Sequence, residues 1–250
     1  MQDYFDTIMD IGEQMLLCGA EIHRVEDSIE RMCYALGATA VDGFIITSSM
    51  VVTVHTSDNC FTQTRRIVNA GNDIERLHKL NQLSRDICSY KLNMEDISDR
   101  LKKIEQQKRY PLWADILSYI FIAGSFSYFF GGNLWDTLTA AFIGTILRFT
   151  VMFIDKFEIN KIFGKLICAF IATVLSFSAM KLGFIGNIDK VMIGNIMVLI
   201  PGVGLTNALR DLFVGDSVSG LLRLIEAVLA TLAIAAGYFL FVFLCGGALL

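Results

Sequence analysis

The segment between residues 200 and 226 holds the side chains of this chain that are best suited to chemistry. It reads Ile-Pro-Gly-Val-Gly-Leu-Thr-Asn-Ala-Leu-Arg-Asp-Leu-Phe-Val-Gly-Asp-Ser-Val-Ser-Gly-Leu-Leu-Arg-Leu-Ile-Glu. Ionisable groups are costly in apolar surroundings, so inside a hydrophobic segment they face a cavity or a partner. An arginine can hold a carboxylate at two points, and an aspartate or glutamate can carry a proton. The segment predicts a site for a small anion.

Helical spacing gathers these side chains on two faces. A proline and two glycines predict a break in a helix, and such breaks form anion sites in transporters. If the helix resumes, Asn207, Arg210 and Asp211 fall on one face. After a turn at Gly215-Asp216, a second helix brings Ser219, Arg223 and Glu226 within about 60° of one another. The alternative is an ordinary cytoplasmic loop over 207–217 with an Arg223–Glu226 ion pair.

These patterns give the expected site residues. For substrate binding they are Pro201, Gly202, Asn207, Arg210 and Arg223. For proton coupling or ion pairing they are Asp211, Asp216, Glu226, Arg148 and Asp115.

The composition indicates that a membrane surrounds this segment. The 250 residues are 54% hydrophobic and only 18% charged, whereas a soluble domain carries about 25% charge. Residues 1–110 hold 13 of the 21 Lys and Arg and 17 of the 25 Asp and Glu. The chain therefore divides at Tyr110-Pro111 into a domain of residues 1–110 and a membrane domain of residues 111–250.

The membrane domain predicts about five spans, because a span needs about 20 mostly apolar residues. They cover 112–131, 135–154, 163–182, 190–206 and 218–247. Asp115 begins the first span, and Arg148 lies near the inner end of the second, where snorkelling to the interface is an alternative role. The loop 155–165 contains three lysines and the loop 131–135 contains none, which places the N-terminus in the cytoplasm. Five spans then place the C-terminus outside, which suits the uncharged tail after residue 245, although the loop 181–190 has a lysine at each end.

The first 110 residues predict a small cytoplasmic α+β domain. Helical spacing covers 3–36, 73–90 and 94–108, and β-rich runs cover 38–48, 50–56 and 60–68. The run Gly-Ala-Glu-Ile-His-Arg-Val-Glu at 19–26 concentrates ionisable groups, among them Glu21, Arg24 and Glu26. A solvated helix face with ion pairs is the alternative for this run.

Several classes of function find no support in the sequence. The start of the chain lacks the pattern of a secretory signal peptide, and the six cysteines suit small apolar residues in a reducing compartment. The three histidines lie far apart, so we expect no metal site. We also expect no cofactor, no enzymatic activity and no nucleic-acid partner, because the chain has neither a phosphate-binding loop nor a nucleophile motif and the first domain is acidic.

The two polar motifs, taken together, resemble the threonine/serine exporter (ThrE) family. The similarity includes residues 201–216 with Gly220, Arg223 and Glu226, residues 19–26, Arg66-Ile67, and Asn-Gln-Leu-Ser at 81–84. It extends over nearly the whole chain, and the order of a cytoplasmic domain before membrane helices also matches. Members of full length have about ten spans, so this chain resembles the larger protein of the split form, which works with a short all-membrane partner.

The resemblance implies an inner-membrane secondary exporter without enzymatic chemistry. Its substrate would be threonine, serine or a dicarboxylate such as succinate, because split members are associated with dicarboxylate export. A homo-oligomer is an alternative to the short partner subunit. A membrane-anchored sensor or scaffold and a channel are the alternative functions; five spans with an intramembrane Arg, Asp and Glu disfavour an anchor.

Overall fold

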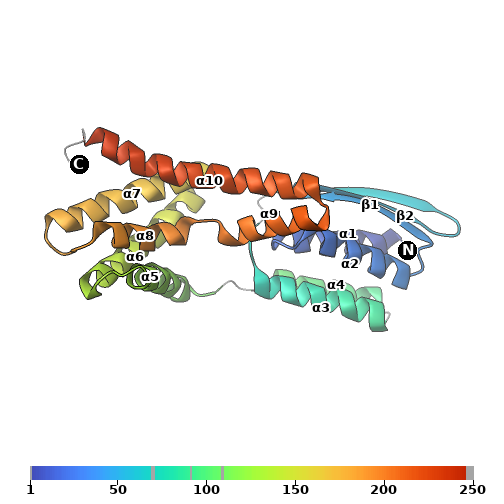
Figure 1. Ribbon diagram of the computed structural model, residues 1–250. Helices are drawn as coiled ribbons and strands as arrows, with labels where there is room; N and C mark the ends of the chain where they lie inside the picture. Colours follow the sequence, from blue (N-terminus) through green and yellow to red (C-terminus); the bar gives the residue numbers. More distant parts are fainter. Residues whose placement is uncertain (1, 69–70, 91, 108–109, 246–250) are drawn as a thin grey trace. The chain divides into compact units, whose positions relative to one another are not determined.

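The computed structural model describes residues 2–68, 71–90, 92–107 and 110–245 (Figure 1). The chain divides into two compact units. The N-terminal unit consists of Met1–Lys108 and Leu205–Leu224, and the helical unit consists of Arg109–Gly204 and Ile225–Leu250. The N-terminal unit is therefore built from two segments that lie far apart in the sequence.

The first segment of the N-terminal unit is an α+β fold. Its elements are α1 (Gln2–Leu17), α2 (Ile22–Ala35), β1 (Ala40–Ile46), β2 (Ser49–His55), β3 (Cys60–Arg66), α3 (Ile74–Tyr90) and α4 (Met94–Glu105). The three strands form an antiparallel sheet in the order β1-β2-β3, in which His55 lies opposite both Ala40 and Cys60. Helices α1 and α2 contact the sheet on one side and the α3–α4 pair on the other (Figure 1).

Alternating and helical apolar patterns explain this core. The middle strand buries Met50, Val52 and Val54, every second residue, against α1 and α2. The close approach of α1 to α2 depends on Gly12, because a Cβ there would lie 2.6 Å from the Cδ1 of Ile29. Asn93 caps the start of α4 by accepting a hydrogen bond from the N–H of Asp96.

The single helix predicted over 3–36 is wrong, because the chain turns between α1 and α2. Gly19 adopts a φ of +86°, which glycine tolerates and most other residues do not. The N–H groups of Gly19 and Ala20 donate to the carbonyls of Leu16 and Met15, a glycine-based helix C-cap. Apolar residues resume helical spacing after the turn, which is why periodicity alone missed it.

The second segment of the N-terminal unit is a helical hairpin. Helix α9 (Gly202–Val214) ends at Gly215, whose φ is +106°, and α10 (Ser217–Leu244) follows. The turn predicted at Gly215-Asp216 is thus confirmed, whereas an ordinary loop over 207–217 is contradicted by α9. A Cβ at Gly220 would lie 2.8 Å from the backbone N of Leu212, so glycine permits the close packing of the two helices. We call residues 205–224 the α9–α10 hairpin.

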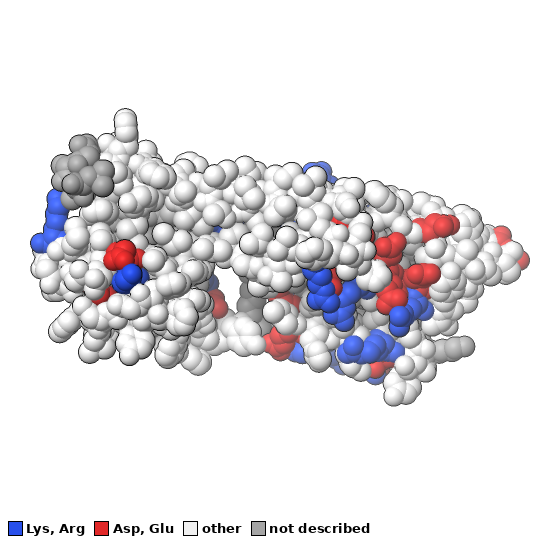
Figure 2. Space-filling model, in the orientation of Figure 1, with Lys and Arg blue, Asp and Glu red and all other residues white. Residues whose placement is uncertain are grey.

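The helical unit is a bundle with an apolar surface. It contains α5 (Leu112–Phe129), α6 (Leu134–Lys156), α7 (Lys161–Lys181), α8 (Ile188–Leu199) and the later part of α10. Small residues line the helix contacts: Gly144 lies against Tyr119 and Ala123, and Gly237 lies against Leu166. Large apolar side chains face outward, among them Phe121, Phe142 and Phe153, as expected of a surface in contact with lipid. In Figure 2 charged side chains gather over the N-terminal unit and few appear over the helical unit.

The described residues contain four helices that are long and apolar enough to cross a membrane, namely α5, α6, α7 and α10. The number rises to five if α8 and α9 together count as one broken span. The chain is thus a mostly helical membrane protein with a small sheet near its N-terminus. The predicted fourth span, 190–206, is interrupted, because α8 ends at Leu199 and α9 begins at Gly202. The uncharged tail at 246–250 lies outside the described residues.

Candidate functional site

The turn between α1 and α2 forms the centre of the candidate site. We call residues 18–21 the α1–α2 linker. The carbonyls of Leu17 and Cys18 accept hydrogen bonds from the N–H groups of Gly71 and Asp73. A Cβ at Gly19 would lie 2.6 Å from the carbonyl oxygen of Gly71. Backbone hydrogen bonds and close packing therefore join the start of the linker to residues 71–73.

Three successive residues of the linker accept hydrogen bonds from the α9–α10 hairpin. Asn207 Nδ2 donates to the carbonyl of Gly19 at 3.4 Å, and Arg223 Nη2 donates to the carbonyl of Ala20 at 2.8 Å. Arg210 Nη1 donates to Glu21 Oε1 at 2.7 Å. The structure thus brings together Asn207, Arg210 and Arg223, which the sequence predicted for substrate binding, and each contacts the linker.

The second contact of Arg223 is a buried ion pair with Asp211. Arg223 Nη1 lies 3.4 Å from Asp211 Oδ2, and the two side chains are 13% and 2% exposed. No hydrogen bond reaches this Asp211 oxygen, nor the buried Oδ2 of Asp216, from the part of the chain that is described. The alternative pair Arg223–Glu226 does not form, and Glu226 is exposed.

Arg210 is the accessible member of the cluster. Its side chain is 59% exposed, whereas Glu21 is only 17% exposed. The guanidinium has five N–H donors, and the contact with Glu21 uses Nη1. An exposed ion pair of this kind contributes about 0–1 kcal/mol, so this contact can open more easily than the buried Arg223–Asp211 pair.

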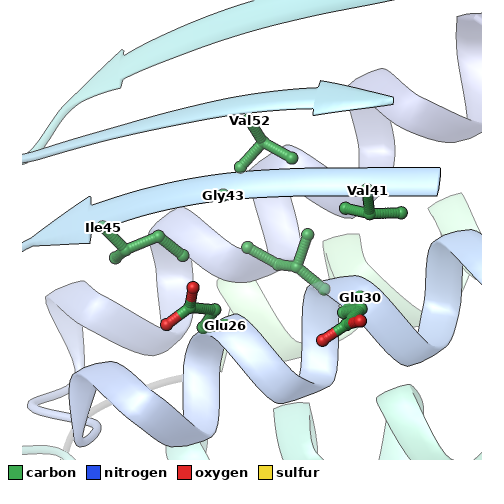
Figure 3. Close-up of a pocket in the computed structure, with 7 residues that line it drawn as sticks. Glu26, Glu30, Val41, Gly43, Ile45 and Val52 are labelled. Atoms are coloured by element: carbon green, nitrogen blue, oxygen red, sulfur yellow. The ribbon is translucent and has the colours of Figure 1, made fainter. Parts of the chain in front are cut away.

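Glu26 lines a small pocket beneath the sheet (Figure 3). The pocket has a volume of about 30 Å³ and is lined by Glu26, Ile29, Glu30, Val41, Gly43, Ile45 and Val52. It can hold one or two water molecules but no metabolite. Burial raises the pKa of Glu26, and the negative charge of Asp216 raises it further. Arg24, the third motif residue, is exposed on α2.

The helical unit pairs the other two predicted polar residues with each other. Arg148 Nη2 donates to Asp115 Oδ2 at 2.7 Å, and the guanidinium carbon lies 5.8 Å from the ring centre of Tyr119. The Arg148 side chain is 17% exposed. This contact favours ion pairing over the snorkelling alternative.

One buried carboxylate was missed by the sequence reasoning. Asp136 is fully buried and accepts hydrogen bonds from the N–H groups of Asn133, Gly186 and Asn187 and from Asn187 Nδ2. Asn133 also accepts from the N–H of Asp136, which completes a capping box at the start of α6. The spacing Asn-x-x-Asp was the available signal. Asp136 joins the loop before α8 to the start of α6.

The remaining predicted residues lie at the helix break. Pro201 and Gly202 separate α8 from α9, and the N–H of Gly202 donates to the carbonyl of Ile200. Across the residues that the structure describes, no group of three or more His, Cys, Asp and Glu side chains is arranged to hold a metal ion.

Comparison with known proteins gives a consistent result. Residues 6–245 match the family ThrE, described as "Putative threonine/serine exporter". A protein of Klebsiella aerogenes named "Probable succinate transporter subunit YjjP" is 27% identical over 230 residues, which are 89% of this chain and 86% of that protein. The Escherichia coli K12 protein of the same name is 26% identical over 231 residues, 90% of this chain and 88% of the relative. No solved structure matches this chain.

The family match includes both polar motifs, the α1–α2 linker and the α9–α10 hairpin, and extends over almost the entire chain. It confirms the resemblance drawn from residues 19–26 and 201–226. The helices of sufficient length and apolarity to span a membrane agree with membership in a transport family. The chain belongs to the threonine/serine exporter family of membrane transport proteins.

Proposed function

We propose that this chain is the larger subunit of an inner-membrane secondary exporter of small carboxylates. The observation that carries the proposal is the match to relatives named as succinate transporter subunits, which extends over most of both chains. Succinate is therefore the first substrate to test, and threonine and serine follow because the family is named for them. Coupling to an ion gradient is part of the proposal.

A second subunit completes the transporter in this proposal. The two relatives carry the word subunit in their names. If α8 and α9 form one broken span, the described residues contain five candidate spans, an odd number that does not divide into two inverted repeats within one chain. The other half would come from a short all-membrane partner, and a second copy of this chain is the alternative.

The polar cluster of the N-terminal unit is proposed to serve the transport cycle. Arg223 and Asp211 form a buried pair, and Arg210 keeps a largely exposed guanidinium next to it. Direct contact of Asn207, Arg210 or Arg223 with a substrate carboxylate stays a prediction. The same holds for the helix break at Pro201 and Gly202.

Export measurements in cells test this function. The chain is expressed alone and together with a candidate partner, which is a short protein of four or five hydrophobic spans sought in the neighbouring reading frames. The candidate partner is also expressed alone. Internal and external succinate, threonine and serine are measured at matched membrane levels. We expect the pair to raise external succinate several-fold over either protein alone, and an ionophore that collapses the proton gradient to abolish accumulation against a gradient.

Two results would contradict ion-coupled carboxylate export, and a third would contradict the need for a partner subunit. Equal efflux with and without the ionophore, driven only by the concentration difference, would indicate a channel. No change in any of the three metabolites for the pair would reject carboxylate export. Full export by the purified chain alone in liposomes would show that no partner subunit is needed, and the proposed exporter function would still hold.

A further inference from the structure

Direct contacts within the N-terminal unit join the α+β domain to the α9–α10 hairpin, which contains most of the second polar motif of the sequence. The α9–α10 hairpin clusters with the α+β domain and not with the helical unit. Both of its arginines and Asn207 donate to the α1–α2 linker. These contacts are a structural observation that the proposed function does not use.

The α1–α2 linker presents a row of hydrogen-bond acceptors to the α9–α10 hairpin. The carbonyl oxygens of Gly19 and Ala20 lie between the end of α1 and the start of α2 and accept hydrogen bonds from Asn207 and Arg223. Because the linker backbone is tied to residues 71–73, its acceptors keep their places when the hairpin moves.

The hairpin in turn is rigid near the linker. Gly220 permits backbone contact between α9 and α10, and the buried Arg223–Asp211 pair joins the same two helices. A displacement of α9 is therefore passed to the start of α10. Glu21 and Arg210 form the outer, solvated contact of the same arrangement.

We propose that the α1–α2 linker is a latch that positions the α9–α10 hairpin for transport, with Glu21 holding Arg210 as a positioning residue. The α+β domain then sets the conformation of α9, which follows the helix break at Pro201, and thereby the rate of the transport cycle. In this proposal Arg210 acts through Glu21, and this role replaces the direct contact with a substrate carboxylate that the sequence predicts for Arg210. This inference rests on the proposed exporter function.

Charge exchange tests the latch. Glu21→Arg and Arg210→Glu are made singly and together, and each is expressed with the partner at matched membrane levels. Each single reversal replaces the attraction between positions 21 and 210 with a repulsion that solvent partly screens, so we expect the maximal succinate export rate to fall about fivefold. The double variant restores the attraction and should recover to within about threefold of the parent. Recovery is incomplete because arginine at position 21 opposes the dipole at the start of α2.

A second ion pair of the same unit provides the control. Asp27 and Arg31 are 2.8 Å apart on α2 and are exposed, and among the described residues no hydrogen bond or ion pair joins either of them to the hairpin. Asp27→Arg, Arg31→Asp and their combination should each export within about twofold of the parent, because this surface pair joins two residues of the same helix.

The KM separates positioning from substrate contact. A latch variant keeps the parent KM and loses maximal rate, whereas loss of a substrate ligand raises KM and is not repaired by the exchange. Export that stays low in the double variant, or an Arg210→Glu variant that changes KM alone, would overturn the latch.

Thermal unfolding of the purified chains separates this inference from the proposed function. The same cycle of variants is measured by apparent Tm in detergent, which needs no transport. A Tm that the double variant recovers, without recovered export, shows a contact with no part in transport and overturns the latch. If the parent protein exports no carboxylate, both the exporter function and the latch are rejected. The Tm values of the variants still test whether Glu21 and Arg210 interact.

Discussion

Arg210 and Arg223 differ in burial, and this difference sets their contributions. Arg223 is 13% exposed and pairs with a carboxylate that is 2% exposed. Removal of one partner from such a buried pair costs about 3–5 kcal/mol, because it leaves an uncompensated charge. Arg210 is 59% exposed, so its neutral replacement costs about 1 kcal/mol at most. Arg223 is therefore suited to holding the hairpin together, and Arg210 to a contact that opens and closes.

The half-buried position of Glu26 predicts a pH-dependent effect on stability. Its pKa is raised from 4.5 in the folded protein, first by burial and then by Asp216. The folded state therefore binds this proton more tightly than the unfolded state, and stability falls as the pH rises above 4.5 through the folded pKa. Glu26→Gln removes the charge, so we expect a higher apparent Tm at pH 7 and a smaller difference below pH 4.5. The rise should stay below the about 2–4 °C that 1 kcal/mol gives in a protein of this size, since Glu26 is partly solvated.

Glu30→Gln is the matched control for Glu26→Gln. Glu30 lines the same pocket on the same helix but is exposed, so its replacement should change the apparent Tm less at pH 7. A Glu26→Gln variant whose Tm is lowered equally at pH 4 and pH 7 would show that the carboxylate stabilises the fold through its shape or its contacts.

Some of these contacts could be predicted from the sequence and others could not. The spacing of Asn207, Arg210 and Asp211 along one helix face suffices to gather them. Their partners include the backbone carbonyls of Gly19 and Ala20. Every residue has a backbone carbonyl, so a pattern of side chains cannot indicate which carbonyl accepts the hydrogen bond. Asp136 was missed for the same reason, because two of its four hydrogen-bond donors are backbone N–H groups of a distant loop.

At the scale of elements, the hairpin depends on the absence of a side chain at Gly220. A Cβ there would lie 2.7 Å from Leu212 Cγ, 2.8 Å from Leu212 N and 3.0 Å from the carbonyl oxygen of Ala208. Two of these atoms belong to the backbone, so the helices must separate. Gly220→Ala should therefore lower the apparent Tm, as overpacking of about 1–3 kcal/mol does. It should also lower succinate export at matched membrane level.

Gly204→Ala is the control for this substitution. Gly204 lies in α9, and the nearest atom to a Cβ there is 3.9 Å away. Alanine also favours a helix over glycine by about 1 kcal/mol, so this variant should be at least as stable as the parent. If Gly220→Ala and Gly204→Ala behave alike in both measurements, the close packing of α9 on α10 has no energetic importance.

Most elements follow from local patterns, and the exceptions have identifiable causes. The alternation of Met50, Val52 and Val54 predicts a half-buried strand, and apolar runs of sufficient length predict α5, α6, α7 and α10. The turn at Gly19 was missed because apolar residues continue at helical spacing on both sides of it. The assignment of α9 to the N-terminal unit was not predictable, because an apolar helix beside a proline reads as part of a span.

At the scale of the whole molecule, labelling of the native cysteines tests on which side of the membrane the N-terminal domain lies. Cys60 is exposed, Cys18, Cys33 and Cys168 are buried, and Cys88 and Cys245 are intermediate. Burial raises the pKa of Cys33 to about 12, which keeps that thiol protonated and unreactive at neutral pH. In a variant with Cys88→Ser and Cys245→Ser, a membrane-impermeant maleimide should label Cys60. We expect labelling in inside-out vesicles and not in right-side-out vesicles, since the N-terminal domain is proposed to be cytoplasmic.

Further replacement of Cys60 by serine provides the blank for this experiment. In this variant without Cys60, labelling of inside-out vesicles should disappear. In the variant that keeps Cys60, both vesicle types should be labelled once they are solubilised. Labelling of Cys60 in intact right-side-out vesicles would place the N-terminal domain on the outer side and reverse the orientation drawn from the lysine-rich loop.

The two-segment composition of the N-terminal unit has a consequence for its biosynthesis. Asn207, Arg210 and Arg223 lie 188, 189 and 203 residues after their partners in the linker. The ribosome therefore finishes the α+β domain long before the hairpin exists, and the linker carbonyls and Glu21 remain solvated while the intervening helices enter the bilayer. Contacts between residues so far apart in sequence form late and slowly. The last step of folding is then the docking of α9 and the start of α10 onto the α+β domain. If an intervening helix inserts wrongly, the hydrogen-bond acceptors of the α1–α2 linker remain without their partners from the hairpin.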